Sequence, residues 1–308
     1  MPLHPKLDYF LSIFPSPQEP TLESIRSRNF VIPEETLPPV SLIENETIIR
    51  QEGDLPIRIY TPDGEGPFPV FVYFHGGGFV YGNLDTHDAI CRLICDKAKQ
   101  LVVSVEYRLA PEHPFPAAPN DAYFAAKYIS DHASKWGGDA NRLTVGGDSA
   151  GGNLAAAVSL ISKENGGPII SNLVMLYPVT DMRKEGKQRY PSYDENRQGY
   201  FLTEKTIKLF SELYFQNPED SNHVYASPIQ VEDVSGFPRT LIITAEFDPL
   251  RDEGEQYAIK LQNAGVEVEL YNAEGLIHGF LNLFSLMGAN DDISDIYERI
   301  ANFLKSHM

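Results

Sequence analysis

The sequence has few positive charges and no long apolar run. Its 25 lysine and arginine residues are outnumbered by 43 aspartate and glutamate residues, and the formal net charge is −18. Nucleic acids and anionic membrane surfaces bind basic patches, so this balance argues against both kinds of partner. No segment reaches the apolar length of a membrane span. The first residues also lack the basic start and apolar core of a signal peptide.

Cysteine is equally scarce, since Cys91 and Cys95 are the only two in the chain. They stand one helical turn apart in an amphipathic run, and two ligands alone make a poor metal site. We therefore expect two small buried side chains and no bound metal. Such sparse cysteine usage is typical of the reducing cytosol, which predicts a cytoplasmic protein.

Short apolar runs alternate with helical stretches from residue 46 onward. This alternation predicts one large α/β domain with a mainly parallel sheet and helices on both faces. The first two strands read as a hairpin-like pair around a turn at Gly53-Asp54. The expected strands are 46–50, 57–60, 70–74, 101–105, 143–145, 173–176, 241–244 and 266–270, and the expected helices are 86–99, 120–134, 151–164, 252–264 and 290–306.

Two segments do not fit this alternation. Residues 1–45 carry repeated prolines between short helical candidates, which indicates a peripheral arm. About sixty residues separate Pro178 from Pro238, far more than a crossover between parallel strands needs. This second segment is rich in tyrosine and phenylalanine, with a helix expected near 203–215. We predict that this insertion (180–225) forms a cap over the strand ends, and that the arm (1–45) flanks a core of 46–179 and 226–308.

The segment Gly147-Asp148-Ser149-Ala150-Gly151 lies between an apolar run and an alanine-rich helical run. Strand, small-residue turn and helix form the context of a nucleophile elbow, in which a strained turn lifts a serine above the sheet. The positive end of the following helix favours negative charge developing beside the serine. The segment therefore predicts Ser149 as a nucleophile.

A serine hydroxyl needs a base to accept its proton and an acid to orient that base. In this fold both follow the serine, with the acid first. His278 lies in a loop just after the 266–270 strand, whereas His223 lies in the insertion and His307 in the tail. We therefore expect His278 to be the base.

Three carboxylates compete as the acid after the 241–244 strand: Glu246, Asp248 and Asp252. Asp252 starts the next helix, where an acidic N-cap is routine. Asp248 precedes a proline, which holds it extended at the end of the strand. We choose Asp248, with Glu246 as the second choice.

A glycine turn, His75-Gly76-Gly77-Gly78, directly follows the buried 70–74 strand. Consecutive glycines let backbone N–H groups approach a ligand without side-chain obstruction. We expect an oxyanion hole formed by Gly76, Gly77 and Gly78 together with Ala150. The preferred donors are the N–H groups of Gly77, Gly78 and Ala150.

Together these motifs resemble the bacterial hormone-sensitive-lipase-like esterases, and the serine block resembles their G-D-S-A-G subgroup. The resemblance covers about residue 45 to the end. It is carried by His75–Gly78, Tyr107–Ala117, Gly147–Asn153 and Asp248–Gly254. It implies an α/β-hydrolase fold with a helical cap built from the arm (1–45) and the insertion (180–225). It also implies carboxylester hydrolysis by Ser149, Asp248 and His278 without a cofactor. Homodimers are ordinary in this family, so the resemblance also allows a homodimer.

Other positions are interpreted beside these motifs. Phe79 stands where the family usually has tryptophan, and we expect the substrate pocket at Phe79, Tyr200, Leu276 and Ile277. The Tyr107–Ala117 segment reads as a structural turn beneath the site. We assign Asp148 no chemistry, although its side chain can fix the elbow through hydrogen bonds.

The predicted function is hydrolysis of small short- to medium-chain acyl esters through an acyl-enzyme. Amide or carbamate hydrolysis is the first alternative, because the same triad serves both reactions. The second alternative is a non-catalytic ligand-binding homologue, as in the plant gibberellin receptors, which resemble this family but lack the triad histidine. The presence of His278 argues against the second alternative.

Overall fold

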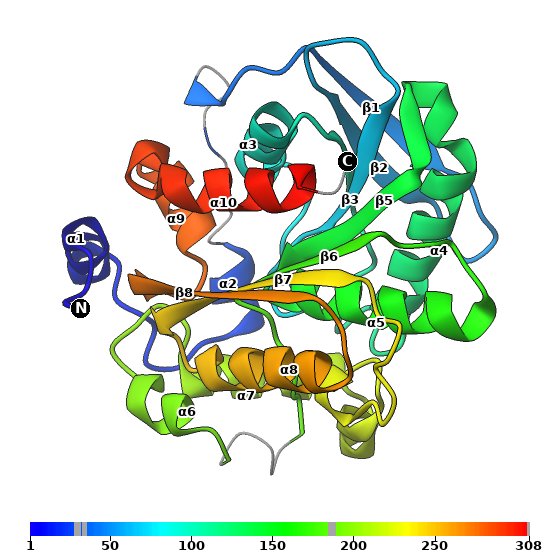
Figure 1. Ribbon diagram of the computed structural model, residues 1–308. Helices are drawn as coiled ribbons and strands as arrows, with labels where there is room; N and C mark the ends of the chain where they lie inside the picture. Colours follow the sequence, from blue (N-terminus) through cyan, green and yellow to red (C-terminus); the bar gives the residue numbers. More distant parts are fainter. Residues whose placement is uncertain (28–31, 33–35, 184–188, 307–308) are drawn as a thin grey trace.

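The computed structural model describes residues 1–27, 32, 36–183 and 189–306 (Figure 1). Within them one sheet has the strand order β1-β2-β4-β3-β5-β6-β7-β8. The first strand pairs antiparallel with β2, and β2 pairs antiparallel with β4, while the remaining pairs are parallel. The strands are β1 (Leu42–Ile48), β2 (Leu55–Thr61), β3 (Phe68–Phe74), β4 (Leu101–Val105), β5 (Gly138–Asp148), β6 (Asn172–Leu176), β7 (Arg239–Phe247) and β8 (Val268–Ile277).

Helices cover both faces of this sheet (Figure 1). The mainly parallel sheet between two helical layers confirms the predicted class, and each helix expected from the sequence is present. The helices are α1 (Pro5–Ile13), α2 (Leu22–Arg26), α3 (Asp88–Ala98), α4 (Ala117–His132), α5 (Ala150–Asn165), α6 (Pro191–Asn196), α7 (Glu204–Tyr214), α8 (Arg251–Asn263), α9 (Phe280–Leu286) and α10 (Ser294–Lys305).

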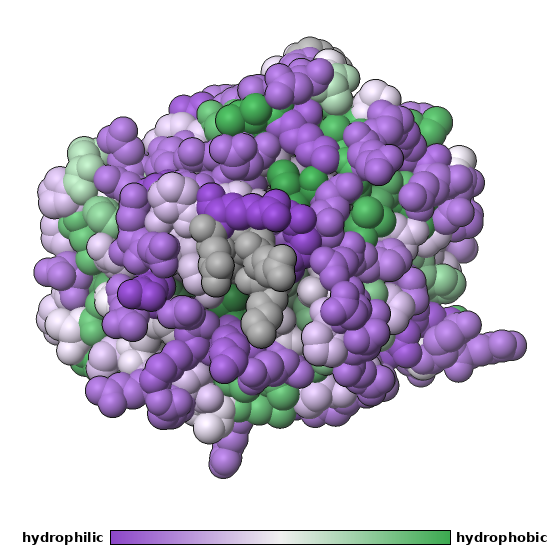
Figure 2. Space-filling model, turned by 90° about the horizontal axis from the view of Figure 1, so that it is seen from below, coloured by the Kyte–Doolittle hydropathy of each residue, from purple (hydrophilic) through white to green (hydrophobic). Residues whose placement is uncertain are grey.

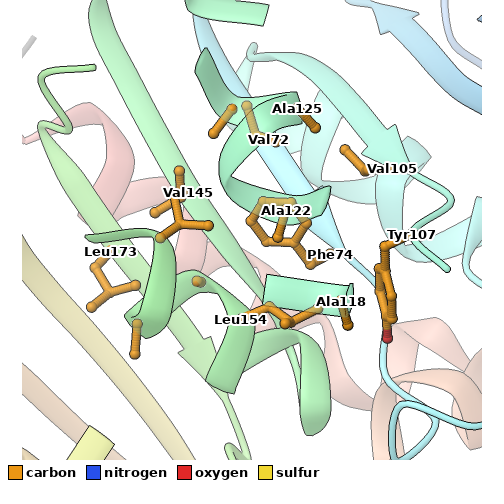
Figure 3. Close-up of a cluster of buried hydrophobic side chains, with 14 of the residues drawn as sticks. Val72, Phe74, Val105, Tyr107, Ala118, Ala122, Ala125, Val145, Leu154 and Leu173 are labelled. Carbon is orange, nitrogen blue, oxygen red and sulfur yellow. The ribbon is translucent and has the colours of Figure 1, made fainter. Parts of the chain in front are cut away.

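Strand β3 shows why the sheet is buried on both sides. Successive strand side chains point to opposite faces. Val72 and Phe74 pack into a cluster with α4, α5 and α8, whereas Phe71 and Tyr73 pack into a second cluster with α3, α9 and α10. A strand buried on both faces therefore requires a continuous apolar run. In a sheet with one face in solvent, polar residues would alternate with apolar ones. Figure 3 shows part of the first cluster, including Val72, Phe74, Val105, Ala122, Val145 and Leu154.

Most strands extend beyond their predicted limits, among them β1, β5 and β8. The first strand begins at Leu42, so the expected arm boundary at residue 45 falls inside β1. Strand β5 begins at Gly138 and β8 continues to Ile277. Polar residues such as those before Leu143 are tolerated there, because pairing of the backbone with neighbouring strands outweighs side-chain preference.

The arm and the insertion contact each other. Ser16 Oγ lies 2.8 Å from the carbonyl oxygen of Tyr200, and Lys205 Nζ lies 2.6 Å from Glu19 Oε1. Arg26 of α2 donates to the carbonyl oxygen of Val80, at 3.0 Å, which joins the arm to the loop after β3. In the described part of the chain, no helix is long and apolar enough to cross a membrane.

Candidate active site

Ser149 lies between β5 and α5 in a strained backbone conformation, with φ 54° and ψ −116°. The left-handed region costs a non-glycine residue of the order of 1–3 kcal/mol, so the surroundings must hold it there. The N–H of Ser149 donates to the carbonyl oxygen of Leu176 at 2.8 Å. A Cβ on Gly147 or Gly151 would collide with the carbonyl oxygen of Phe74, so β3 can approach only glycines here. This is the geometry expected of a nucleophile elbow.

The loops after β7 and β8 bring an acid and a base to this serine. His278 Nε2 lies 2.9 Å from Ser149 Oγ, and His278 Nδ1 lies 2.7 Å from Asp248 Oδ2. The second oxygen of Asp248 accepts the N–H of Leu250 at 2.8 Å. All three side chains are buried, and Asp248 is fully so. The arrangement is a continuous hydrogen-bonded chain from carboxylate to hydroxyl.

The other two carboxylates weighed from the sequence are used elsewhere. Glu246 accepts the amino group of Met1 at 2.8 Å and the N–H of Gly275 at 2.7 Å. Asp252 is not the N-cap expected from the sequence, because α8 begins at Arg251 with Leu250 as its N-cap. Asp252 instead accepts the N–H of Ser192 at 2.7 Å and so anchors the insertion. Neither is hydrogen-bonded to the imidazole, whereas the preferred carboxylate is.

The competing histidines do not enter this chain of hydrogen bonds. The ring of His223 lies 5.4 Å from that of Phe115, and its Nδ1 accepts a backbone N–H within the insertion. His307 lies outside the described residues. Of the described histidines, only His278 is hydrogen-bonded to Ser149.

The glycine turn after β3 lies beside the serine and supplies unused N–H groups. The N–H of Gly76 donates to Asp148 Oδ1 at 2.8 Å, so this residue supports the turn instead of offering its donor. Among the described residues, the N–H groups of Gly77 and Gly78 have no hydrogen-bond partner. Ala150 is the first residue of α5, and the first N–H groups of a helix have no partner within it.

Asp148 ties the turn to the elbow. Its Oδ1 also accepts the hydroxyl of Tyr73 at 2.7 Å and lies 3.4 Å from His87 Nε2. Burial by itself raises the pKa of the Asp148 carboxyl, but His87 and the hydrogen bonds from Tyr73 and Gly76 hold that pKa below its usual range. A buried carboxylate therefore fixes the glycine turn in place. The sequence indicated such hydrogen bonds but not their partners.

His75, the first residue of this turn, also helps to hold the turn in place. Its ring stacks on Tyr107 with centroids 4.3 Å apart, and the Tyr107 hydroxyl donates to the His75 carbonyl oxygen at 2.7 Å. Burial lowers the pKa of His75 to about 3, so the ring is neutral and its Nδ1–H donates to the carbonyl oxygen of Gly76. These contacts agree with a structural role for the 107–117 segment.

Two cavities meet at Ser149. The first extends past His278 and Leu283, and the second, of about 540 Å³, extends beneath the insertion. Leu202 and Phe210 line both cavities and form the wall between them. Sequence reasoning missed these two residues, and the only available signal was the aromatic richness of the insertion.

The expected pocket residues are placed differently by the structure. Phe79 lines the second cavity, where its ring stacks on Tyr214 at 4.0 Å. Tyr200, Leu276 and Ile277 line neither of the two cavities. The ring of Tyr200 packs on the ring of Phe247 at the end of β7. Leu276 and Ile277 belong to β8, which runs longer than expected and turns their side chains into the core.

No described residues form a group of three or more metal-ligating side chains. Cys91 and Cys95 are buried free thiols on α3, as their spacing in the sequence predicts. Burial raises the pKa of both thiols, so neither is poised as a nucleophile.

Comparison with known proteins agrees with this architecture. A family model described as the alpha/beta hydrolase fold matches residues 71–282. The carboxylesterase NlhH of Mycobacterium tuberculosis is 38% identical over 280 residues, which cover 90% of this chain and 86% of that protein. The chain belongs to the hormone-sensitive-lipase-like esterases. Its sheet and the helices that cover it are thus those of an α/β hydrolase.

Other members of this esterase family extend the likeness. LipN of M. tuberculosis, named a carboxylic ester hydrolase, is 45% identical over 244 residues, 77% of this chain and 64% of that protein. The crystallised esterase of Pyrobaculum calidifontis is 37% identical, with a TM-score of 0.89 over 99% of both chains. The chain is accordingly a carboxylic ester hydrolase of this family.

Proposed function

We propose that the chain is a serine carboxylesterase with Ser149, His278 and Asp248 as its triad. Ser149 Oγ attacks the ester carbonyl carbon while its proton passes to His278 Nε2. The tetrahedral intermediate collapses to an acyl-enzyme, and the same proton leaves with the alcohol oxygen. Water then repeats the sequence and releases the acid. The observation that carries this proposal is the unbroken chain of hydrogen bonds, 2.7 Å and 2.9 Å long, across the imidazole.

The negative oxygen of the intermediate requires hydrogen-bond donors in a fixed position. We assign this role to the N–H groups of Gly77, Gly78 and Ala150. The glycine N–H groups are unpaired among the described residues, and Ala150 begins a sixteen-residue helix whose dipole favours negative charge. Gly76, whose N–H is bound to Asp148, holds the turn rather than the oxyanion.

Gly77→Ala and Gly78→Ala should each lower kcat about a hundred- to a thousandfold, the usual effect of losing one such donor. Both glycines have positive φ, and a Cβ would collide with the Tyr81 carbonyl oxygen at Gly77 and with the Phe210 ring at Gly78. Turnover of ethyl butanoate, followed by titration of released acid, measures this loss. Gly236→Ala is the matched control, since Gly236 also has positive φ but no atom near its Cβ position. Near-normal turnover in both turn variants would place the oxyanion elsewhere.

Each of the two cavities binds one part of the ester, either the alcohol part or the acyl part. The leaving alcohol must take a proton from His278, and of these two cavities only the first is lined by this histidine. We therefore assign the alcohol to the first cavity and the acyl chain to the second. The acyl cavity is lined by apolar residues near the serine, among them Phe79, Val179 and Leu250.

Ethyl esters should be hydrolysed best when the acyl chain has about four to eight carbons. Each buried CH₂ contributes about 0.8 kcal/mol until the cavity is full, and overpacking then costs roughly 1–3 kcal/mol. Hydrophilic residues cover most of the face shown in Figure 2, with hydrophobic ones in small separate groups, so this face offers no broad lipid-binding surface. A series of ethyl esters of graded acyl length gives the profile as kcat/KM.

Two comparisons accompany this series. Ile207→Phe, which narrows the acyl cavity, should move the optimum to shorter chains. N-Ethylbutanamide should react far more slowly than ethyl butanoate, and the reverse order would identify an amidase. Strong activation by emulsified long-chain triglyceride, with butanoate esters poor, would show a lipase instead.

A further inference from the structure

The alcohol cavity has apolar walls but a hydrogen-bonding end. Ile25, Leu283 and Leu286 line its sides. Thr86, His87 and Asn282 also line it, and none of them belongs to the triad or the glycine turn. A cavity that accepts only alkyl groups gains nothing from such side chains, because desolvating polar groups costs free energy.

These three side chains form a connected row. Thr86 Oγ1 lies 2.9 Å from His87 Nδ1, and His87 Nε2 lies 2.8 Å from the Asn282 carboxamide. His87 is 3% exposed, and it packs behind Thr86 and Asn282, which are only partly buried. The buried His87 therefore holds the row in place, and Thr86 and Asn282 face the cavity.

Asn282 retains hydrogen-bonding capacity in this row. A carboxamide has a donor and an acceptor atom, and His87 occupies one of them. The other atom has no partner among the described residues. Whichever way the carboxamide is turned, a hydroxyl can satisfy this atom, because a hydroxyl both donates and accepts.

The position of Asn282 sets where such a hydroxyl must lie on the substrate. Asn282 is in the first turn of α9, four residues after His278. This cavity receives the alcohol part of the ester, beside the imidazole that protonates the departing oxygen. The cavity is small, about 100 Å³, so the alcohol must be short.

We propose that the Thr86-His87-Asn282 row selects esters whose short alcohol part carries a second hydroxyl group, such as monoesters of small diols or of glycerol. This inference rests on the proposed esterase function and names the substrate class of the same site. The second hydroxyl binds Asn282, while the first becomes the leaving oxygen beside His278. The acyl chain contributes nothing to this preference.

The test compares isosteric substrates on the intact enzyme. 2-Hydroxyethyl butanoate and propyl butanoate differ only by a hydroxyl in place of a methyl on the alcohol. We expect kcat/KM to favour the hydroxyethyl ester about tenfold, within the range for one hydrogen bond gained and one polar group left unpaired. Propyl 3-hydroxybutanoate and propyl 3-methylbutanoate make the same exchange on the acyl side, and there we expect no preference for the hydroxyl.

Variants locate the preference. Asn282→Leu should reduce the tenfold ratio to about one, and Thr86→Val should reduce it in part by loosening the row. Ser211→Ala, which removes a hydroxyl from the acyl cavity, is the control and should leave the ratio unchanged. A wild-type ratio of one or below overturns the inference without any variant, as does a ratio that survives Asn282→Leu. Absence of hydrolysis of both butanoate esters would instead contradict the proposed function.

Discussion

Ser149→Ala should lower kcat for ethyl butanoate about a millionfold, as removal of the nucleophile does in serine hydrolases whose triad acts as a unit. In the proposed mechanism the hydroxyl oxygen of Ser149 forms the bond to the substrate. The remaining activity would reflect the oxyanion donors and substrate binding. Ser159→Ala is a matched control, because Ser159 is a buried serine of the adjacent helix whose hydroxyl donates to the Ala155 carbonyl oxygen.

The same nucleophile can be identified without kinetics. A fluorophosphonate should add once to the wild-type chain, as intact mass would show, and should not add to Ser149→Ala. The control variant Ser159→Ala should be labelled like the wild type. Labelling that persists after Ser149→Ala would mean that another residue is the nucleophile.

Asp248→Asn should lower kcat about ten-thousandfold while the protein stays folded, by analogy with the same exchange in another serine hydrolase. A carboxamide can present its N–H₂ to His278 Nδ1, and the ring then holds its proton on Nε2. In that tautomer the imidazole cannot accept the proton of Ser149. The carboxylate is therefore needed to keep the ring proton on Nδ1 as well as for its negative charge. The rate of ester hydrolysis at pH 7 measures the loss of kcat.

Glu246→Gln is the appropriate control, because Glu246 was the second choice as the acid and stands two residues away. It bonds to the backbone at Gly275 and to the amino group of Met1, not to the imidazole. We expect at most a modest loss of kcat. If Glu246→Gln were the more damaging of the two changes, the assignment of the acid would be wrong.

The core and the residues proposed for the triad were predictable because their local requirements are severe. A serine with φ 54° between a buried strand and a helix needs glycine on both sides, and this leaves a mark in the sequence. Asp248 could be chosen over its neighbours because the following proline restricts its backbone. The strands buried on both faces likewise require continuous apolar runs, which a sequence shows directly.

The substrate cavities left no comparable local pattern in the sequence. Their walls come from side chains such as Leu202, Phe210 and Asn282, which meet only after the insertion packs over the core. Leu276 and Ile277 were expected beside the substrate because they precede His278. Strand β8 instead continues through both residues, and their side chains pack into the core. Packing between distant segments, rather than local pattern, therefore sets specificity.

The strand order places the proposed nucleophile and the proposed base after strands that differ in their number of neighbours. Ser149 follows β5, which is flanked by β3 and β6, whereas His278 follows β8, which pairs with β7 alone among the described strands. An edge strand opens at a lower free energy than the centre of a sheet, because it has fewer neighbours to release. Fraying of β8 would carry the imidazole away while the elbow stays intact. On heating, hydrolytic activity should then disappear some degrees before the far-UV circular dichroism signal of the sheet and helices does, so that the working temperature of the enzyme is set by its last strand.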